Sequence, residues 1–153
     1  IKDIKKSLST FPGLEGRMEL LRTLKGVKIY NDNNATTPEA TIAGLEALKK
    51  KVILITGGND KNLPLKGLSH ALQKYTKRIY FLPGTGTHRY LREKHFQRNV
   101  LLVRNLKEAV KLSFTEAKKG DVILFSPAFS SFSQYANEYE RNDEFVKIVK
   151  KWK

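Results

Sequence analysis

Short segments rich in hydroxyl, amide and glycine residues contain most of the side chains that could bind a small molecule. They are residues 31–37, 57–61, 83–87, 104–105 and 126–131. Lys61 can place a positive charge on a carboxylate or a phosphate, and the hydroxyl groups of Thr36, Ser130 and Ser131 can donate hydrogen bonds to the same groups. Paired glycines let backbone N–H groups approach an anion closely. Such residues are also common in turns and helix caps, so only their convergence would indicate a site.

Apolar runs precede these segments and predict the strands that must position them. The runs are residues 27–30, 52–56, 78–82, 100–103 and 122–125. Because apolar and polar residues do not alternate within them, the runs are typical of strands buried on both faces, and therefore of a parallel sheet. The polar segments would then lie together outside the carboxyl ends of the strands, where open α/β sheets bind their ligands.

Helical patterns separate the runs. Thr37, Pro38 and Glu39 provide an N-cap, a proline at the first helical position and an early acid. The expected apolar helix faces are, in chain order, Ile42, Leu45 and Leu48; Leu65, Leu68 and Leu72; Leu106, Ala109, Val110 and Phe114; and Phe145, Ile148, Val149 and Trp152, the last set in a helix from about Ser131 to the end of the chain. This alternation of strands and helices predicts a doubly wound α/β sheet.

The segment before the first clear strand predicts a different unit. Residues 18–30 are expected to form a hairpin with Gly26 in its turn, which adds an antiparallel strand at the sheet edge. We therefore predict a single domain, residues 1–153, of the α/β class, with a Rossmann-like, mostly parallel, doubly wound sheet and an antiparallel edge hairpin. The chain opens at Ile1 in a pattern that resembles a helix entered midway. We expect a piece of a longer polypeptide, with processing of a complete chain as the alternative.

Composition and missing motifs exclude several classes of protein. The longest aliphatic run, residues 52–55, is far shorter than the roughly 20 residues that span a bilayer, so no membrane protein is expected. The chain has no cysteine, which excludes disulfides and thiolate sites, and its histidines are not spaced as metal ligands. A G-x-x-x-x-G-K-[ST] phosphate loop and a G-x-S-x-G elbow are absent, and residues 84–86 begin a G-x-G-x-x-G motif that ends in Arg89 instead. No signal-peptide pattern is visible, which favours the cytoplasm.

The charge of the chain points to anionic partners without selecting one. Twenty-nine basic and fifteen acidic residues give a net charge of +14, which suits nucleic acid, a nucleotide or an acidic membrane surface. The positive residues are spread along the chain, and lysine outnumbers arginine. Because readers of nucleic-acid bases favour arginine with interleaved aromatic residues, a nucleic-acid-binding module is only an alternative hypothesis.

Four stretches of the sequence carry a resemblance to a known family. They are residues 11–19 (FPGLEGRME), 30–37 (YNDNNATT), 57–61 (GGNDK) and 126–131 (SPAFSS), the last continuing to Asn137, Glu140 and Arg141. In order and spacing they resemble the Mur ligases, and within that family the carboxy-terminal domain of the D-glutamate-adding member. The resemblance extends over nearly the whole chain, from about Phe11 to Trp152.

The resemblance implies a function and a set of site residues. Mur ligases of this type are cytoplasmic, monomeric enzymes of peptidoglycan synthesis that join D-glutamate to UDP-N-acetylmuramoyl-L-alanine through an acyl phosphate, using ATP and Mg²⁺. A UDP-binding domain and a central ATPase domain, which holds Mg²⁺, complete the enzyme, so this domain alone would be inactive and carry no catalytic residue. By analogy, the residues that contact the nucleotide would be Arg17, Asp32 and Asn34, with Asp32 at the ribose, and the residues that hold the carboxylates of D-glutamate would be Thr36, Lys61 and Ser131.

Some positions depart from the family pattern. Asn34 stands where many relatives carry lysine, Ser133 replaces a common acidic residue, and Asn142 replaces a glycine. Glu138 and Tyr139 compete for the position of an aromatic residue near D-glutamate. A sibling Mur-type ligase that uses another amino acid therefore stays open as an alternative.

Overall fold

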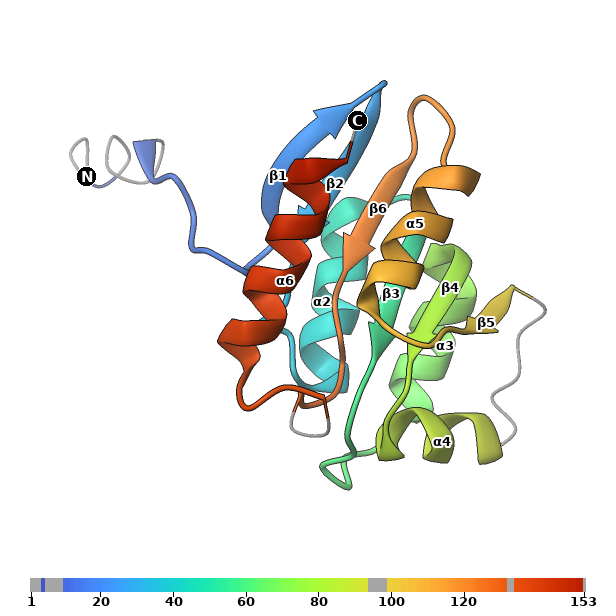
Figure 1. Cartoon of the computed structure of the whole chain (residues 1–153). Helices are drawn as coiled ribbons and strands as arrows, with labels where there is room; N and C mark the ends of the chain where they lie inside the picture. Colours follow the sequence, from blue (N-terminus) through green and yellow to red (C-terminus); the bar gives the residue numbers. More distant parts are fainter. Residues whose placement is uncertain (1–3, 5–9, 94–98, 132–133, 153) are drawn as a thin grey trace.

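A computed structural model of the chain, which describes residues 4, 10–93, 99–131 and 134–152, contains one six-stranded sheet. The strands are β1 (Glu19–Leu24), β2 (Val27–Asn31), β3 (Val52–Gly57), β4 (Thr76–Leu82), β5 (Val100–Leu102) and β6 (Val122–Phe125). Their order across the sheet is β1-β2-β6-β3-β4-β5 (Figure 1). All neighbouring strands are parallel except β1 and β2. The predicted parallel sheet with an antiparallel edge hairpin is confirmed.

A two-residue turn joins β1 to β2. Leu24 pairs with Val27, so only Lys25 and Gly26 lie outside the ladder. Both have positive φ, +51° and +80°, as the type I′ turns favoured in hairpins require. Glycine adopts this conformation without steric cost, which is why Gly26 marks the hairpin in the sequence.

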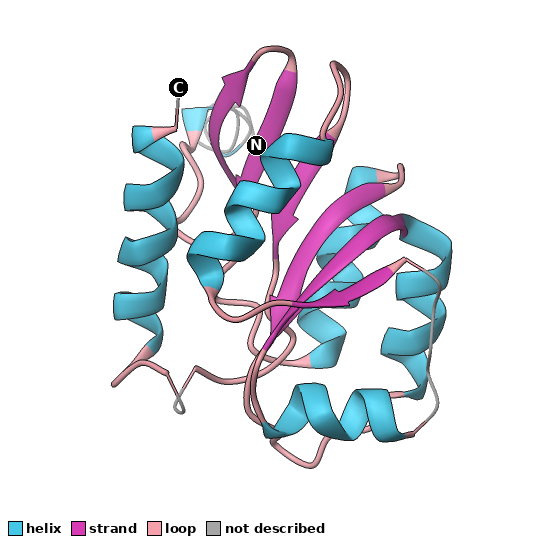
Figure 2. Ribbon diagram, turned by 45° about the vertical axis from the view of Figure 1, so that its right-hand side comes forward, coloured by secondary structure: helices cyan, strands magenta, loops and turns pink. Residues whose placement is uncertain are grey.

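Helices cover both faces of the sheet. They are α2 (Pro38–Leu48), α3 (Lys66–Tyr75), α4 (Thr85–Arg92), α5 (Leu106–Glu116) and α6 (Glu138–Lys151). Helices α5 and α6 lie on one face, and α2 and α3 on the other, while α4 lies beyond the carboxyl end of β4 (Figures 1 and 2). The result is the expected three-layer Rossmann-like architecture.

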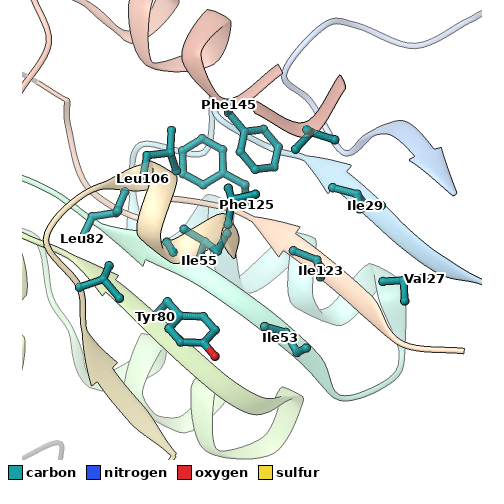
Figure 3. Packing of buried hydrophobic residues seen from close by; sticks show 14 residues of the cluster. Val27, Ile29, Ile53, Ile55, Tyr80, Leu82, Leu106, Ile123, Phe125 and Phe145 are labelled. Carbon is teal, nitrogen blue, oxygen red and sulfur yellow. The ribbon is translucent and has the colours of Figure 1, made fainter. Parts of the chain in front are cut away.

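The central strands are apolar along their whole length because they contribute to two cores. Ile53 and Ile55 of β3 pack towards α5 and α6 (Figure 3), whereas Val52 and Leu54 pack towards α2 and α3. All four side chains are fully buried. The expected helix faces are also confirmed: the members that line the two cores, buried or half-buried, are Ile42, Leu45, Leu48, Leu65, Leu68, Leu72, Leu106, Ala109, Val110, Phe114, Phe145, Ile148, Val149 and Trp152.

Four elements differ from the sequence-based expectation. Strand β2 is not buried on both faces, because Lys28 is exposed and Tyr30 is half-buried. Helix α6 begins after its N-cap Asn137 and not near Ser131, because the serine-rich stretch forms a loop. Strand β5 is not buried on both faces: as the edge strand it leaves Leu101 44% and Leu102 48% exposed. Helix α4 was not predicted at all, since it starts inside a glycine-rich segment.

In the described part of the chain, no helix is long and apolar enough to cross a membrane.

Candidate functional site

Four of the five polar segments meet at the carboxyl edge of the sheet. The loop after β6 is bonded to the loop after β2, where Ala128 N donates to Ala35 O at 2.9 Å. It is also bonded to the loop after β3, where Asn59 and Ser130 exchange backbone hydrogen bonds of 2.9 and 3.0 Å. The start of α4 bonds to that same β3 loop. The fifth segment, residues 104–105, lies apart and lines a separate hollow along α5.

Thr36 and Lys61 come from different loops and touch. Lys61 Nζ donates a hydrogen bond of 3.0 Å to Thr36 Oγ1. Thr36 lies between β2 and α2, and Lys61 lies between β3 and α3. Among the described residues, no acidic side chain forms an ion pair with Lys61. Lys61 is also exposed, so its ammonium group is available to an anionic ligand.

Helix α4 holds the loop that carries Lys61. Arg89 Nη1 donates to both carboxylate oxygens of Asp60 at 3.0 Å. The hydroxyl of Thr85 accepts a 3.0 Å hydrogen bond from Asp60 N, and Asp60 Oδ1 accepts one of 2.9 Å from Asn62 N. The residue next to Lys61 is thus bound from three sides, which restricts where the ammonium group can lie.

Arg17 and Asn34 lie beside Thr36. Arg17 Nη1 donates to Asn34 O at 3.2 Å, and these three residues line one hollow together with Glu138 and Tyr139. The two residues that compete for the aromatic position of the family therefore both border this hollow. Three of the predicted site residues share it, and Lys61 adjoins it through Thr36.

Asp32 lies deeper, beneath the same loop. Its Oδ2 accepts a 2.8 Å hydrogen bond from Ser126 Oγ, and its Oδ1 accepts one of 3.2 Å from Met18 N. Burial raises the pKa of the Asp32 carboxyl, although the hydrogen bonds from Ser126 and Met18 and the charge of Arg17 oppose that shift. Gly44 of α2 packs so closely that a Cβ there would lie 2.9 Å from Asp32 Oδ2. Asp32 is a buried acceptor that lines neither of the hollows described here.

Ser131 lies in a second, narrow hollow at the same edge. The hollow is lined by the backbone of Gly57 and Gly58, together with Tyr135 and Arg141. Ser131 Oγ is buried and has no hydrogen-bond partner among the described residues. The structure therefore places Ser131 apart from the Thr36 hollow. Arg141, which lines the Ser131 hollow, is bonded to the backbone of the loop after β2.

Sequence reasoning assigned no role to Arg141 or to its partner Asn33. Arg141 Nε donates to Asn33 Oδ1 at 2.8 Å, and Nη2 donates to Asn33 O at 3.0 Å. Arg141 Nη1 reaches Phe129 O at 3.4 Å. The arginine thus connects α6 to the loops after β2 and β6. The one available signal was its spacing: Arg141 and Phe145 occupy the same face of α6 at positions i and i+4.

The paired glycines do not cradle an anion, which corrects the sequence-based expectation. The N–H of Gly57 donates to Pro127 O, and that of Gly58 donates to Thr87 Oγ1. The glycine at position 58 allows close approach instead, since a Cβ there would lie 2.3 Å from Ser130 O. Glycine is required because it lets the loops of the site touch.

Metal-binding groups are sparse around the site. The described part of the chain contains no group of three or more His, Cys, Asp or Glu side chains that could hold a metal ion. A Mg²⁺ ion that accompanies ATP therefore finds no preformed carboxylate cage here, and no step proposed below runs through one.

Comparison with protein-family models matches residues 16–129 to the family described as Mur ligase, glutamate ligase domain. The match covers most of the chain and includes Arg17, Asp32, Thr36 and Lys61. The chain belongs to the Mur ligase family. The match ends before Ser131, so the second hollow lies only partly within it.

Curated relatives agree with the family match. The chain is 40% identical to the UDP-N-acetylmuramoylalanine–D-glutamate ligase of Clostridium beijerinckii over 98% of its own length and 34% of the relative. It is 38% identical to the enzyme of the same name from Acetivibrio thermocellus, over 95% of the chain and 33% of the relative. The chain therefore spans about a third of the length of the relatives that it matches.

Solved structures share the fold at lower identity. UDP-N-acetylmuramate-alanine ligase MurC from Thermotoga maritima superposes with a TM-score of 0.67 at 17% identity, over 95% of this chain and 32% of that one. MurF ligase from the same organism, solved with ADP, gives a TM-score of 0.64 at 23% identity, over 95% and 33%. These likenesses confirm the α/β fold of the chain.

Proposed function

We propose that this chain is the carboxy-terminal domain of an ATP-dependent ligase that adds D-glutamate to UDP-N-acetylmuramoyl-L-alanine in peptidoglycan synthesis. The names of the relatives at 40% and 38% identity support the substrate. Within the chain itself, the observation that carries the proposal is the contact between Lys61 and Thr36 at the carboxyl edge of the sheet. An unpaired ammonium group beside a hydroxyl group is a suitable receptor for a carboxylate.

The chemistry requires this domain to bind and orient the amino acid. Transfer of the γ-phosphoryl group of ATP to the muramoyl-alanine carboxylate gives an acyl phosphate and ADP. The amine of D-glutamate then attacks the acyl carbon, phosphate leaves, and an amide remains. Lys61 and Thr36 hold one carboxylate of D-glutamate, which turns a bimolecular attack into a nearly unimolecular one.

The nucleotide lies against the neighbouring residues in this proposal. Arg17 and Asn34 line the open hollow, where the guanidinium group can contact phosphate or stack on the base. Asp32 retains free lone pairs and accepts a hydrogen bond from a ribose hydroxyl group. Mg²⁺ comes with the nucleotide and the central domain, and the complete enzyme acts as a cytoplasmic monomer.

Substitution of the carboxylate receptor in the complete ligase tests the proposal. Lys61→Gln and Thr36→Val should each raise the KM for D-glutamate by about 10- to 100-fold, the value of a hydrogen bond to a charged group. The KM for ATP should change far less. Lys51→Gln is the matched control, because Lys51 is exposed at the opposite edge of the sheet, just before β3.

Two outcomes would contradict the proposal. An unchanged KM for D-glutamate in both variants removes Thr36 and Lys61 from the binding site. A wild-type ligase with a higher kcat/KM for another amino acid replaces D-glutamate with that substrate and identifies the chain as part of a sibling ligase.

A further inference from the structure

The edge of the sheet opposite the candidate site carries a dense group of lysines. Four segments meet there, at the amino ends of the parallel strands: residues 25–28, 49–51, 76–77 and 118–121 (Figures 1 and 2). They contain eight exposed lysines, which we call the lysine edge: Lys25, Lys28, Lys49, Lys50, Lys51, Lys77, Lys118 and Lys119. These residues are scattered along the sequence, so only the fold shows that they form one group.

Side-chain and backbone contacts join the four segments into one surface. Gly120 N donates a hydrogen bond of 2.9 Å to Gly26 O in the β1–β2 turn. Lys50 Nζ donates to Gly120 O at 2.6 Å, and Lys77 forms an ion pair with Asp121. The turn between α5 and β6 therefore contacts all three other segments, and the lysines lie close together.

Acidic side chains compensate little of this charge. Within the four segments only Asp121 is acidic, and it accepts a 2.7 Å hydrogen bond from Lys118 N as well as pairing with Lys77. The nearby Glu116 is already paired with Arg78 at 2.7 Å. Over the part of the chain that the structure describes, the other seven lysines form no ion pair. Like charges at short distance repel each other, and an external anion relieves that repulsion.

Helix ends explain only part of the lysine edge. A helix favours a cation near its carboxyl end, where the macrodipole is negative. Lys49 is the C-cap of α2, and Lys118 follows the C-cap of α5. Lys25 and Lys28 lie in the β1–β2 hairpin, where no helix ends, so they have no such role. An exposed group of this size therefore indicates an anionic partner outside the domain.

The arrangement fits a flat anionic surface better than a nucleic acid. The four segments extend along the sheet from β2 to β4, and across it from the end of α2 on one face to the end of α5 on the other. The unpaired cations are all lysines, which lack the planar fork that arginine uses on phosphates and bases. The four segments also contain no aromatic residue on which a base could stack.

We propose that the lysine edge is an interaction surface for a bilayer that contains anionic lipids. This inference goes beyond the function proposed above and does not depend on it. Each lysine near such a surface raises the partition coefficient about fivefold, and salt screens the attraction over about 8 Å at physiological ionic strength. The candidate site lies at the other end of the same strands, about 20 Å away along the six residues of β3. The bound domain therefore keeps Lys61 accessible.

Cosedimentation of the complete ligase with lipid vesicles tests the inference. The vesicles contain either phosphatidylcholine alone or equal parts of phosphatidylcholine and phosphatidylglycerol. The wild type should bind only the anionic vesicles, and high salt should release it. A fourfold edge variant, with Lys28→Gln, Lys51→Gln, Lys118→Gln and Lys119→Gln, should have a partition coefficient about 100-fold lower or less.

A matched variant removes four positive charges from elsewhere in the domain. Its changes are Lys66→Gln, Arg92→Gln, Lys107→Gln and Lys111→Gln, all at exposed positions outside the lysine edge. Because these positions lie beyond the screening distance, its partition coefficient should stay within about fivefold of the wild type. Both variants should keep the kcat and the Tm of the wild-type ligase.

Three outcomes would overturn the inference. Wild-type ligase that does not bind the anionic vesicles has no such surface, and equal losses in the two fourfold variants would show an effect of net charge alone. A DNA duplex that displaces the ligase from the vesicles at equal phosphate concentration would identify a nucleic-acid surface instead.

Lysine acetylation of the wild-type ligase decides if the edge variant does not fold. Anionic vesicles should lower the acetylation of the lysine edge severalfold, measured by mass spectrometry, and leave Lys66 and Lys107 unchanged. Equal acetylation of the lysine edge with and without vesicles would overturn the inference.

Discussion

Asp32 shows that a side chain of the site can lower the stability of the domain. Asp32 is 5% exposed, and burial raises the pKa of its carboxyl group above the ordinary value of 3.8. Between that value and the raised pKa, the folded state binds more protons than the unfolded state, so stability falls as the pH rises. Above the raised pKa, the folded protein carries the whole cost of the buried charge.

Asp32→Asn should therefore stabilise the fold while it weakens nucleotide use. At pH 7 we expect a higher Tm than in the wild type, because the neutral amide can keep its hydrogen bonds with Met18 and Ser126. The difference in Tm should shrink as the pH falls towards 3.8. In the complete ligase the KM for ATP should rise about tenfold or more. Thermal melts from pH 4 to 8 check the first effect, with the exposed Asp143→Asn as control. A lower Tm at pH 7 would contradict the assignment of Asp32 as a charge kept for function.

Among the elements, helix α4 holds the loop that carries Lys61 through its bonds to Asp60. Arg89→Gln removes the ion pair between α4 and Asp60 and leaves only the hydrogen bond from Asp60 N to Thr85, so Lys61 should become less ordered. Because the ion pair is partly exposed, we expect a loss of stability of about 1 kcal/mol or less. The KM for D-glutamate should rise a few-fold, while Arg92→Gln on the same helix leaves it unchanged. Steady-state kinetics of the complete ligase measure this KM. Equal KM values for D-glutamate in Arg89→Gln and Arg92→Gln would show that α4 does not position Lys61.

The contact between the loops after β3 and β6 requires a glycine at position 58. Gly58 has φ of +144°, and a Cβ there would lie 2.3 Å from Ser130 O. Gly58→Ala should therefore cost about 3 kcal/mol or more, the sum of backbone strain and overpacking, and lower the Tm by roughly 6 °C or more. Gly120→Ala is the control, because Gly120 also has positive φ, +92°, but nothing lies within 4 Å of its Cβ position. Similar losses in Tm for the two variants would refute the close-contact argument.

Periodicity predicts an element well where packing follows the sequence pattern, and poorly elsewhere. Strand β3 is apolar throughout because both of its faces are buried, so its pattern matches its environment. Helix α4 has two glycines at its start, Gly84 and Gly86. Position 86 requires glycine because a Cβ there would lie 2.3 Å from the Phe129 side chain. Nothing local in the sequence reveals that contact. By contrast, Asn137 caps Glu140 N three residues on, a signature that could have located the start of α6.

The same reasoning explains which parts of the site could be predicted. Thr36 and Lys61 follow buried strands, and parallel strands bring their carboxyl ends together, so their contact follows from the topology. Arg141 lies on the same face of α6 as Phe145, but a charged residue type favours exposure, and the tertiary structure shows that it is buried. The N–H groups of Gly57 and Gly58 were expected to approach an anion, but they donate hydrogen bonds to Pro127 and Thr87, which are distant in sequence.

At the scale of the whole molecule, the charge of +14 does not by itself define a partner. At the carboxyl edge of the sheet, one cation is placed by the fold where it can meet an anionic ligand: Lys61 is exposed and has no acidic partner among the described residues. Recognition therefore depends on where the fold directs a few charges, and the net charge mainly sets solubility and long-range attraction.

This 153-residue chain should bind ligands without turning them over. Its sequence contains no G-x-x-x-x-G-K-[ST] phosphate loop, and its described residues offer no carboxylate cluster for a metal ion. Phosphoryl transfer depends on such groups to position the phosphates and to neutralise the charge that develops on them. We expect no ADP above background when the chain is mixed with ATP, Mg²⁺, D-glutamate and UDP-N-acetylmuramoyl-L-alanine in a coupled assay. A cooperative thermal melt of the same sample shows that the chain is folded. Sustained ADP release that is lost in Lys61→Gln would show that this domain holds the whole catalytic apparatus, and would place phosphoryl transfer at the carboxyl edge of this sheet.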